Sequence, residues 1–198
     1  MAQTDRGGVY ELSARLASLG EYGCDVAVRT KALPLMRQLH EAFDETVNLG
    51  LLEGLHIRCM QVIETTQALR WIVNPGAMDM PQTTVPGRAI VAYLPSEQQA
   101  WFVVKVCATL KGRTRKTACA ELEVELAVTG ARGFAQEEEE EEEETVAGVV
   151  CVALPLADFG ELRAAVSVSM PVHRFPAATS AARWAAVRQI REMSAANA

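Results

Sequence analysis

The chain has 198 residues, of which 25 are acidic and 19 basic, and eight of the acids form one run at residues 137–144. Without that run, 17 acidic residues face 19 basic ones, which excludes the strong positive charge typical of a nucleic-acid-binding surface. The 49 % of hydrophobic residues suffice for a folded core, and the length predicts one compact domain.

The sequence gives no sign of a membrane or secreted protein. No apolar stretch reaches the roughly 20 residues that span a bilayer, and residues 1–8 are polar, unlike a signal peptide. We therefore expect a soluble cytoplasmic protein without a membrane partner. Five cysteines are an odd number and none forms a CxxC pair, which predicts free and mostly buried thiols. These are Cys24, Cys59, Cys107, Cys119 and Cys151.

The first third of the chain predicts two helices and three strands. Leucines at helical spacing followed by Gly20 predict a short amphipathic helix at residues 11–19. Asp25 is a suitable cap for a second helix that runs to about Phe43 and contains Pro34, which removes a helical hydrogen bond. Alternating apolar residues then predict a hairpin of strands 47–51 and 57–63, followed by a third strand at residues 68–73.

The remainder predicts helices followed by strands. Helices are expected at residues 88–93, from Ser96 to Cys107 and at residues 117–128, and strands at residues 148–154 and 162–170. Spaced apolar residues from Trp184 to Ile190 predict a final helix. Short turns between neighbouring strands favour antiparallel pairing, so the predicted class is α+β, with helices covering one side of an antiparallel sheet.

The sequence offers no catalytic apparatus. Three scattered histidines and the absence of CxxC or HxxxH spacing argue against a metal site. No phosphate-binding loop, dinucleotide motif or nucleophile elbow is present, so we expect no catalytic residue and no cofactor. Cys151 lies in an apolar strand without an adjacent base, which favours a packed thiol over a nucleophile.

Three features leave alternatives open. Ser167 and Ser169 share one strand face, where they could bind a polar ligand or simply face solvent. The loop at residues 74–87 could close over such a ligand or be only a long connection. The glutamate run has like charges at every helical neighbour, which favours a solvated mobile loop over a cation site.

Six segments follow one another in a recognisable order: Val9-Tyr10-Glu11-Leu12, Glu45-Thr46-Val47-Asn48-Leu49, Gly87-Arg88-Ala89, Gly133-Phe134-Ala135, residues 148–153 and residues 164–171. This order resembles one family, the effector-binding domain of IclR-type bacterial transcription regulators, and the resemblance spans the chain from about Tyr10 to the final helix.

The resemblance implies an architecture and partners. It implies a curved antiparallel sheet flanked by helices, like GAF-type sensors, at residues 25–198. Residues 1–24 then correspond to a wing-strand remnant and a linker helix. DNA would be bound only through a winged helix-turn-helix domain absent from these residues, so the chain is either a segment cut to the effector domain or a reading frame that has lost its DNA-binding part. A homodimer or tetramer is expected.

The resemblance also implies a ligand pocket between the sheet and its covering loop. The corresponding residues are Leu69, Ile72, Met80, Val85, Pro86, Gly87, Glu137, Val149, Cys151, Ser167 and Ser169. Free amides at a helix start near Val85 to Gly87 would suit a small organic acid, and the apolar lining would suit an acid with an apolar body. The glutamate run would lie at the pocket rim and disfavour anionic effectors at low salt.

Two main functions remain open at this point. The first is effector sensing with allosteric control of DNA binding by an oligomeric regulator. The alternative is an oligomerisation-only module that pairs with a full-length regulator and senses no ligand. Bulky side chains filling the space between Ser167, Cys151 and Met80 would favour the alternative. An enzyme is the third and weakest reading, and it would require a nucleophile beside a base in the pocket.

Overall fold

The structure, a computed structural model, describes residues 2–3, 10–11, 14–109, 115–138, 148–156, 163–175 and 192. The helices are α1 (Ala14–Phe43), α2 (Val85–Ala92), α3 (Ser96–Thr109) and α4 (Arg115–Arg132), with a short 3-10 turn at Pro81–Thr83. The strands are β1 (Ala2–Gln3), β2 (Tyr10–Glu11), β3 (Thr46–Glu53), β4 (His56–Ile63), β5 (Met78–Asp79), β6 (Ala135–Glu138), β7 (Val149–Leu156) and β8 (Ala164–Pro171).

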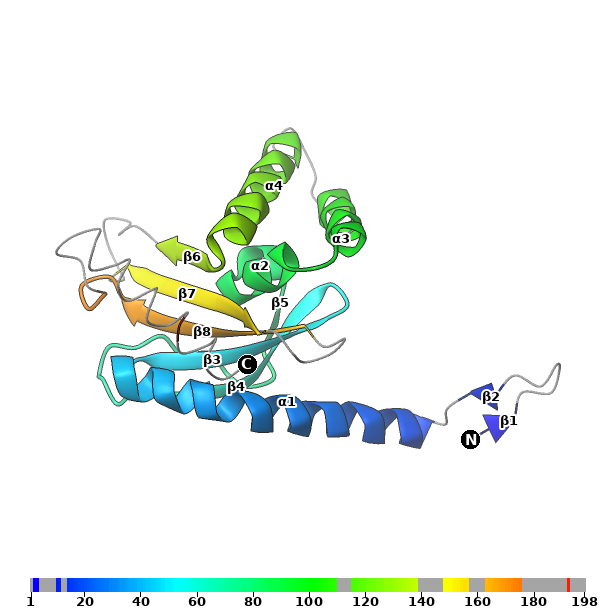
Figure 1. Cartoon of the computed structure of the whole chain (residues 1–198), viewed down its shortest axis with the longest axis horizontal. Helices are drawn as coiled ribbons and strands as arrows, with labels where there is room; N and C mark the ends of the chain where they lie inside the picture. The colour runs from blue at the N-terminus through cyan, green and yellow to red at the C-terminus, as the bar shows by residue number, and fades with distance from the viewer. Residues whose placement is uncertain are drawn as a thin grey trace.

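Six strands form one curved sheet in the order β5-β4-β3-β8-β7-β6 (Figure 1). Every neighbouring pair is antiparallel, which confirms the predicted α+β class. The predicted β3–β4 hairpin is also confirmed. The two central strands, β3 and β8, are far apart in the sequence: Asn48 of β3 donates a hydrogen bond to Ser169 of β8, 121 residues later. This non-local pair brings the two halves of the chain together.

The two faces of the sheet carry different side chains because alternate residues of a strand point to opposite sides. One face is rich in Val, Leu and Met and packs against the apolar stripe of α1. The opposite face is built from small residues such as Ala153 and Ala165, against which α2 packs. The expectation that helices cover one side is therefore wrong: α1 lies below the sheet and α2 above it (Figure 1).

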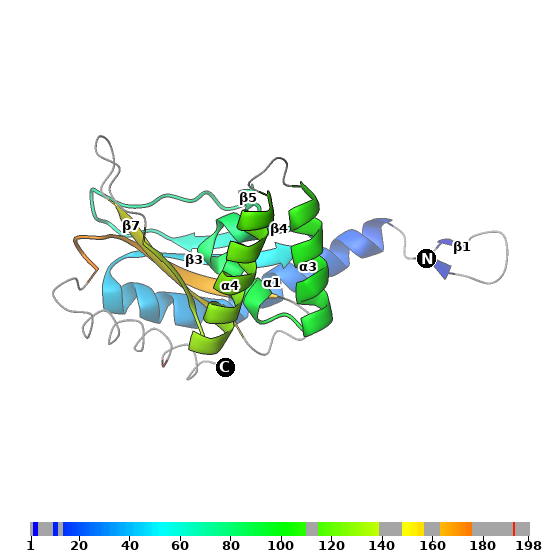
Figure 2. The same cartoon turned by 90° about the horizontal axis from the view of Figure 1, so that it is seen from above.

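Helix α1 is one continuous helix, and the prediction of two helices separated at Gly20 is wrong. A glycine inside a helix costs only about 1 kcal/mol, so it ends a helix only where nothing else sustains the helix. Here the C-terminal part is held on the sheet by buried Val28, Leu35 and Leu39. Figure 2 shows α1 extending beyond the sheet toward β1 and β2.

The prediction of a third strand at residues 68–73 is wrong. Residues 68–73 form no strand, and Leu69, Trp71 and Ile72 are exposed in an irregular connection. The strand that follows β4 in the sheet is the two-residue β5, which pairs with Ile57 and Arg58. β6 was not predicted at all, because its sequence Ala-Gln-Glu-Glu merges into the glutamate run.

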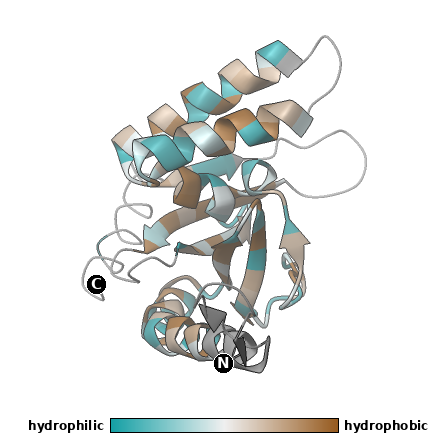
Figure 3. Cartoon of the chain, turned by 90° about the vertical axis from the view of Figure 1, so that its right-hand side faces the viewer, coloured by the Kyte–Doolittle hydropathy of each residue, from teal (hydrophilic) through white to brown (hydrophobic). Residues whose placement is uncertain are grey.

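Helices α3 and α4 match their predictions closely, and both stand on the side of α2, opposite α1 (Figure 3). Cys107 of α3 and Cys119 of α4 lie at a Cα–Cα distance of 5.9 Å and form a disulfide. The expectation of five free thiols is therefore wrong for this pair. Cys24 is exposed, Cys59 is buried and Cys151 is partly buried, and all three are free.

Some predictions concern residues that the structure does not describe. These are the final helix between Trp184 and Ile190 and residues 139–144, which are most of the glutamate run. Among the described helices, none combines the length and the apolar character that crossing a membrane requires.

Candidate functional site

A cavity of about 490 Å³ lies on the face of the sheet that α2 partly covers. Its floor comes from β3, β4, β7 and β8, and its other walls come from the segment at residues 71–77, β5 and the start of α2. Lining residues are Asn48, Leu49, Gly50, Ile57, Cys59, Trp71, Ile72, Val73, Asn74, Ala77, Asp79, Thr83, Thr84, Val85, Pro86, Glu137, Val149, Cys151, Ser167 and Ser169.

The cavity exists because the floor carries small side chains. Asn48 and Gly50 of β3 share a face with Ser167 and Ser169 of β8, and Asn48 is paired directly with Ser167. Cys151 of β7 is paired with Ser169 on the other side. These short side chains cannot reach α2 or the connection above them, so a space remains where the large aliphatic residues of the opposite face would leave none.

The floor residues form a chain of neutral hydrogen bonds. Asn48 Nδ2 donates to Ser169 Oγ at 3.4 Å, and Ser169 Oγ donates to Cys151 Sγ at 3.4 Å. Asn48 Oδ1 is buried and has no hydrogen-bond partner among the described residues. Burial raises the pKa of the Cys151 thiol to about 11, an effect that hydrogen bonds with Ser169 and Ser167 partly offset. The thiol is therefore neutral at physiological pH.

The start of α2 offers fewer open amides than the sequence predicts. Pro86 has no N–H, and Gly87 N–H donates to Thr84 Oγ1 at 3.2 Å. Arg88 N–H donates to the Thr84 carbonyl at 3.0 Å. Two of the three positions expected to offer an amide, Pro86 and Gly87, are therefore not open to an anion.

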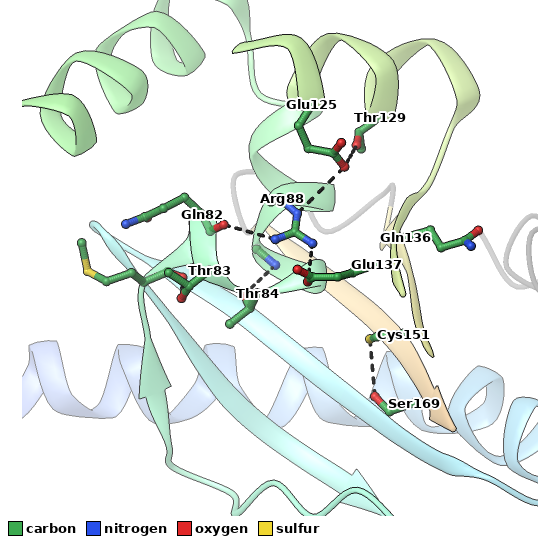
Figure 4. A network of polar contacts seen from close by, with 12 residues as sticks. Gln82, Thr83, Thr84, Arg88, Glu125, Thr129, Gln136, Glu137, Cys151 and Ser169 are labelled. Carbon is green, nitrogen blue, oxygen red and sulfur yellow. Dashed lines mark hydrogen bonds and ion pairs between the residues drawn. The ribbon is translucent and has the colours of Figure 1, made fainter. Parts of the chain in front are cut away.

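Arg88 lies behind the cavity and binds the carboxylate at its rim (Figure 4). Its Nη2 donates to Glu137 Oε2 at 2.5 Å and its Nη1 to the Gln82 carbonyl at 3.3 Å. Its Nε also lies 4.0 Å from Glu125 Oε1 of α4. Arg88 is itself almost fully buried and is not among the lining residues. The network joins α2, α4 and β6 around the cavity.

Hydrogen bonds at Thr65 and Leu69 hold the first part of the connection above the cavity, before Trp71 and Ile72. Arg174 Nη2 donates to the Leu69 carbonyl at 2.8 Å, and the same guanidinium pairs with buried Glu45. Thr65 Oγ1 donates to the Asp44 carbonyl at 2.7 Å. These bonds hold the connection to the end of α1 and the start of β3.

Eight of the eleven residues expected at the pocket line this cavity: Ile72, Val85, Pro86, Glu137, Val149, Cys151, Ser167 and Ser169. Leu69, Met80 and Gly87 do not. Leu69 is exposed and contributes only its carbonyl to Arg174, and the Met80 carbonyl accepts from Thr83. Gly87 is pressed against Pro81, where an added Cβ would lie 2.3 Å from the carbonyl oxygen.

Several residues line the cavity that were not among those expected from the sequence. Asn48 was recognisable, because it shares the alternation of β3 with Gly50 and is the one amide of that face. Trp71, Asp79 and Thr84 carry no such signal, because they lie in or beside irregular backbone. The short β5 that positions Asp79 is formed by pairing with β4 and not by a pattern of its own.

The described part of the cavity has no arrangement for catalysis. Its lining contains no histidine, and the hydrogen-bond partner of Cys151 is a serine hydroxyl and not a base. No group of three His, Cys, Asp or Glu side chains is placed to hold a metal ion within the described ranges. The site as described can enclose a small molecule and exchange hydrogen bonds with it.

Comparison of the sequence with known proteins finds one matching family and several relatives. The family model described as "Bacterial transcriptional regulator IclR C-terminal" matches residues 22–195. The HTH-type transcriptional regulator BhcR of Paracoccus denitrificans is 31 % identical over 166 residues, which cover 83 % of this chain and 58 % of that protein. The glycerol operon regulatory protein of Streptomyces coelicolor is 29 % identical over 159 residues, covering 79 % and 59 %. The chain thus spans less than two thirds of the length of these relatives.

Solved structures share the fold. The IclR crystal structure from Thermotoga maritima has a TM-score of 0.69 at 23 % identity and covers 91 % of this chain and 72 % of that one. An IclR homologue from Microbacterium hydrocarbonoxydans, complexed with 4-hydroxybenzoate, has a TM-score of 0.65 at 18 % identity, with coverages of 94 % and 74 %.

Proposed function

Because the chain belongs to the IclR family of bacterial transcriptional regulators, we propose that it is the effector-binding and oligomerisation domain of such a regulator. The relatives and the family are transcriptional regulators and not enzymes. In this proposal a small molecule occupies the cavity and changes the relative stability of two conformations of the domain.

The cavity is the observation that carries the proposal. Its volume of about 490 Å³ falls within the roughly 300–1,000 Å³ usual for small-molecule sites. The space beside Ser167 and Cys151 is open and not filled by bulky side chains of the described residues, which weighs against a module that only oligomerises. The unpartnered Asn48 Oδ1 in the floor also favours a ligand, because a buried amide oxygen without a partner is costly.

The proposed effector is a small molecule with an apolar body. Trp71, Ile72 and Val149 supply apolar walls, and the related structure with 4-hydroxybenzoate supports a ligand of that size. The small organic acid expected from the sequence depended on free amides at the start of α2. Gly87 N–H is bound by Thr84 and Pro86 has no N–H, so these two positions do not favour an acid head group.

The proposed output passes through α1. This helix packs on the sheet with its C-terminal part and extends beyond it with its N-terminal part (Figure 2). A winged helix-turn-helix domain of the regulator would bind DNA in the cytoplasm, with residues 1–24 as wing remnant and linker helix and residues 25–198 as the sensing domain. The relatives, of which the chain spans less than two thirds, have the additional length for such a domain.

The proposed oligomer uses the exposed apolar residues of α3 and α4. Trp101 and Val104 on α3 are 52 % and 66 % exposed, and Val124 and Val128 on α4 are 63 % and 45 % exposed. Each pair lies at helical spacing on one face of its helix. We expect a homodimer or tetramer by sedimentation, and replacing Val104 and Val124 with Glu should shift it toward the monomer.

A ligand screen with a blocked cavity tests the sensing function. A ligand at 100 times its dissociation constant should stabilise the domain by about 2.7 kcal/mol. Ser167→Leu fills the cavity and should abolish the rise in melting temperature, whereas Thr66→Leu, at an exposed position outside the lining, should retain it. A rise that survives Ser167→Leu unchanged would place the ligand elsewhere and contradict the proposal.

A further inference from the structure

We propose that the cavity selects an uncharged, hydroxyl-bearing effector and discriminates against carboxylates. The inference rests on the sensing function proposed above and specifies the chemistry of its ligand. It depends on three observations: the charges of the lining residues, the pairing of the nearest cation, Arg88, with Glu137, and the neutral polar groups of the floor.

Within the described lining the net charge is negative and comes from Asp79, because Glu137 is paired with Arg88 from behind the cavity. Among the described residues that line the cavity, Asp79 and Glu137 are carboxylates, and none is Lys, Arg or His. The glutamate run continues directly from Glu137. A carboxylate that enters this space loses hydration and meets like charge, and both effects oppose its binding.

The nearest buried cation is already neutralised. The Arg88 guanidinium pairs with Glu137 and also donates to the Gln82 carbonyl, so an incoming acid would have to displace Glu137 to reach it. The start of α2 offers few open amides, because Pro86 lacks an N–H and Thr84 accepts from the amides of Gly87 and Arg88. The paired guanidinium and these amides are thus already engaged and do not favour an anion.

The floor suits a neutral hydroxyl group. Asn48, Ser167 and Ser169 each offer a donor and an acceptor, and a hydroxyl group is both as well. An alcohol can donate to Asn48 Oδ1, which lacks a partner, and accept from a serine hydroxyl. An ammonium group would need an unpaired carboxylate at this depth, but Glu137 is paired and Asp79 is exposed at the rim.

Alkylation of Cys151 measures the cavity's charge preference without knowledge of the effector. Iodoacetamide is neutral and iodoacetate is an anion, and with both the thiolate displaces iodide to form a C–S bond. We expect the iodoacetate-to-iodoacetamide rate ratio at Cys151 to be at least about threefold lower than for 2-mercaptoethanol in the same solution, as like-charge repulsion requires. Asp79→Asn should raise the ratio. A ratio at Cys151 equal to or above that of 2-mercaptoethanol would overturn the inference.

A matched ligand set then tests selection directly. Several aliphatic and aromatic bodies are each supplied as carboxylate, primary alcohol and primary amine, and the melting temperature of the whole chain is followed. We expect alcohols to bind at least about tenfold more tightly than the matching acids. Glu137→Gln, which releases Arg88 from its carboxylate partner, should reverse this order.

The outcomes separate the two proposals. Tighter binding of acids or amines to the unchanged protein overturns the selection of a neutral head group and leaves the sensing function intact. Absence of stabilisation by every member of the set overturns the sensing function and the selection with it, whatever the alkylation ratio.

Discussion

Arg58 of β4 holds Asp25 of α1 through two hydrogen bonds, Nη1 to Oδ2 at 3.1 Å and Nη2 to Oδ1 at 2.8 Å. The same guanidinium binds Glu53 of β3, and the two carboxylates raise the pKa of Arg58 above its usual value. Ile57 and Cys59, which flank Arg58 in β4, line the cavity on the opposite face. One strand therefore contacts the cavity with one face and the long helix with the other.

Replacing this arginine should loosen α1 from the sheet. Arg58→Met keeps the length of the side chain and removes the charged hydrogen bonds, so we expect the free energy of unfolding to fall by about 1–2 kcal/mol. Arg70→Met removes a more exposed pair with Glu64 at 3.5 Å and should change it by less than about 0.5 kcal/mol. Urea denaturation of both variants at low and high salt measures the difference. Equal losses would show that Arg58 is only a surface ion pair.

The alternation of apolar residues was sufficient to predict β3, β4, β7 and β8, because these strands bury one face against α1. The same alternation identified Ser167 and Ser169 as neighbours on the opposite face, where the cavity lies. The strands at the sheet edges could not be found in this way. β5 has two residues and β6 is acidic, so both are specified by pairing with β4 and β7 and not by their own composition.

The polar network around the cavity could not be predicted from the sequence, because it joins residues that only the tertiary structure brings together. Arg88 and Glu137 are 49 residues apart, and their pairing requires α2 to lie across β6. The amides at the N-terminus of α2, in contrast, are occupied by local residues. Thr84 followed by Pro86 indicates this in the sequence, because threonine is a good helix cap and proline has no N–H. The resemblance to the family had favoured open amides instead.

Gly87 is required by the close contact between α2 and the turn at Pro81–Thr83. An added Cβ would lie 2.3 Å from the Pro81 carbonyl oxygen and 2.5 Å from its Cα, and backbone atoms cannot move aside cheaply. We expect Gly87→Ala to lower the free energy of unfolding by about 1–3 kcal/mol.

Gly23→Ala is the matched control, because Gly23 lies in α1 with nothing within 4 Å of its added Cβ. That change should stabilise the chain by about 0.5–1 kcal/mol, since alanine favours helix and limits the unfolded chain. Thermal and urea denaturation of the two variants measure the opposite signs. If Gly23→Ala also lowered the free energy of unfolding, Gly23 would have to lie against residues other than those described.

The disulfide between Cys107 and Cys119 predicts a simple thiol count. In denaturant without reductant the chain should expose three thiols, those of Cys24, Cys59 and Cys151, and five after reduction. Replacing Cys107 and Cys119 with Ser should lower the free energy of unfolding by roughly 2–3 kcal/mol, because a short loop in the unfolded chain is no longer closed. Cys24→Ser should leave it unchanged. Five thiols in the unreduced protein would exclude the disulfide in solution.

The raised pKa of Cys151 predicts both its reactivity and a pH dependence of stability. Burial raises the pKa of this thiol to about 11 from its usual value of 9, so the folded chain holds the thiol proton more tightly than the unfolded chain. The resulting stabilisation is complete below about pH 9 and is lost as the pH rises toward 11. Cys151→Ser has no thiol proton to lose. Between pH 9 and pH 11, its free energy of unfolding should therefore fall by about 2 kcal/mol less than that of the wild-type chain.

In the wild-type chain, the rate of iodoacetamide labelling of Cys151 should rise about tenfold per pH unit up to about pH 11. Ser169→Ala, which removes a hydrogen bond that lowers this pKa, should slow labelling at pH 9. Labelling that levels off near pH 9 would show an ordinary, solvated thiol and contradict the burial of Cys151 in the cavity floor.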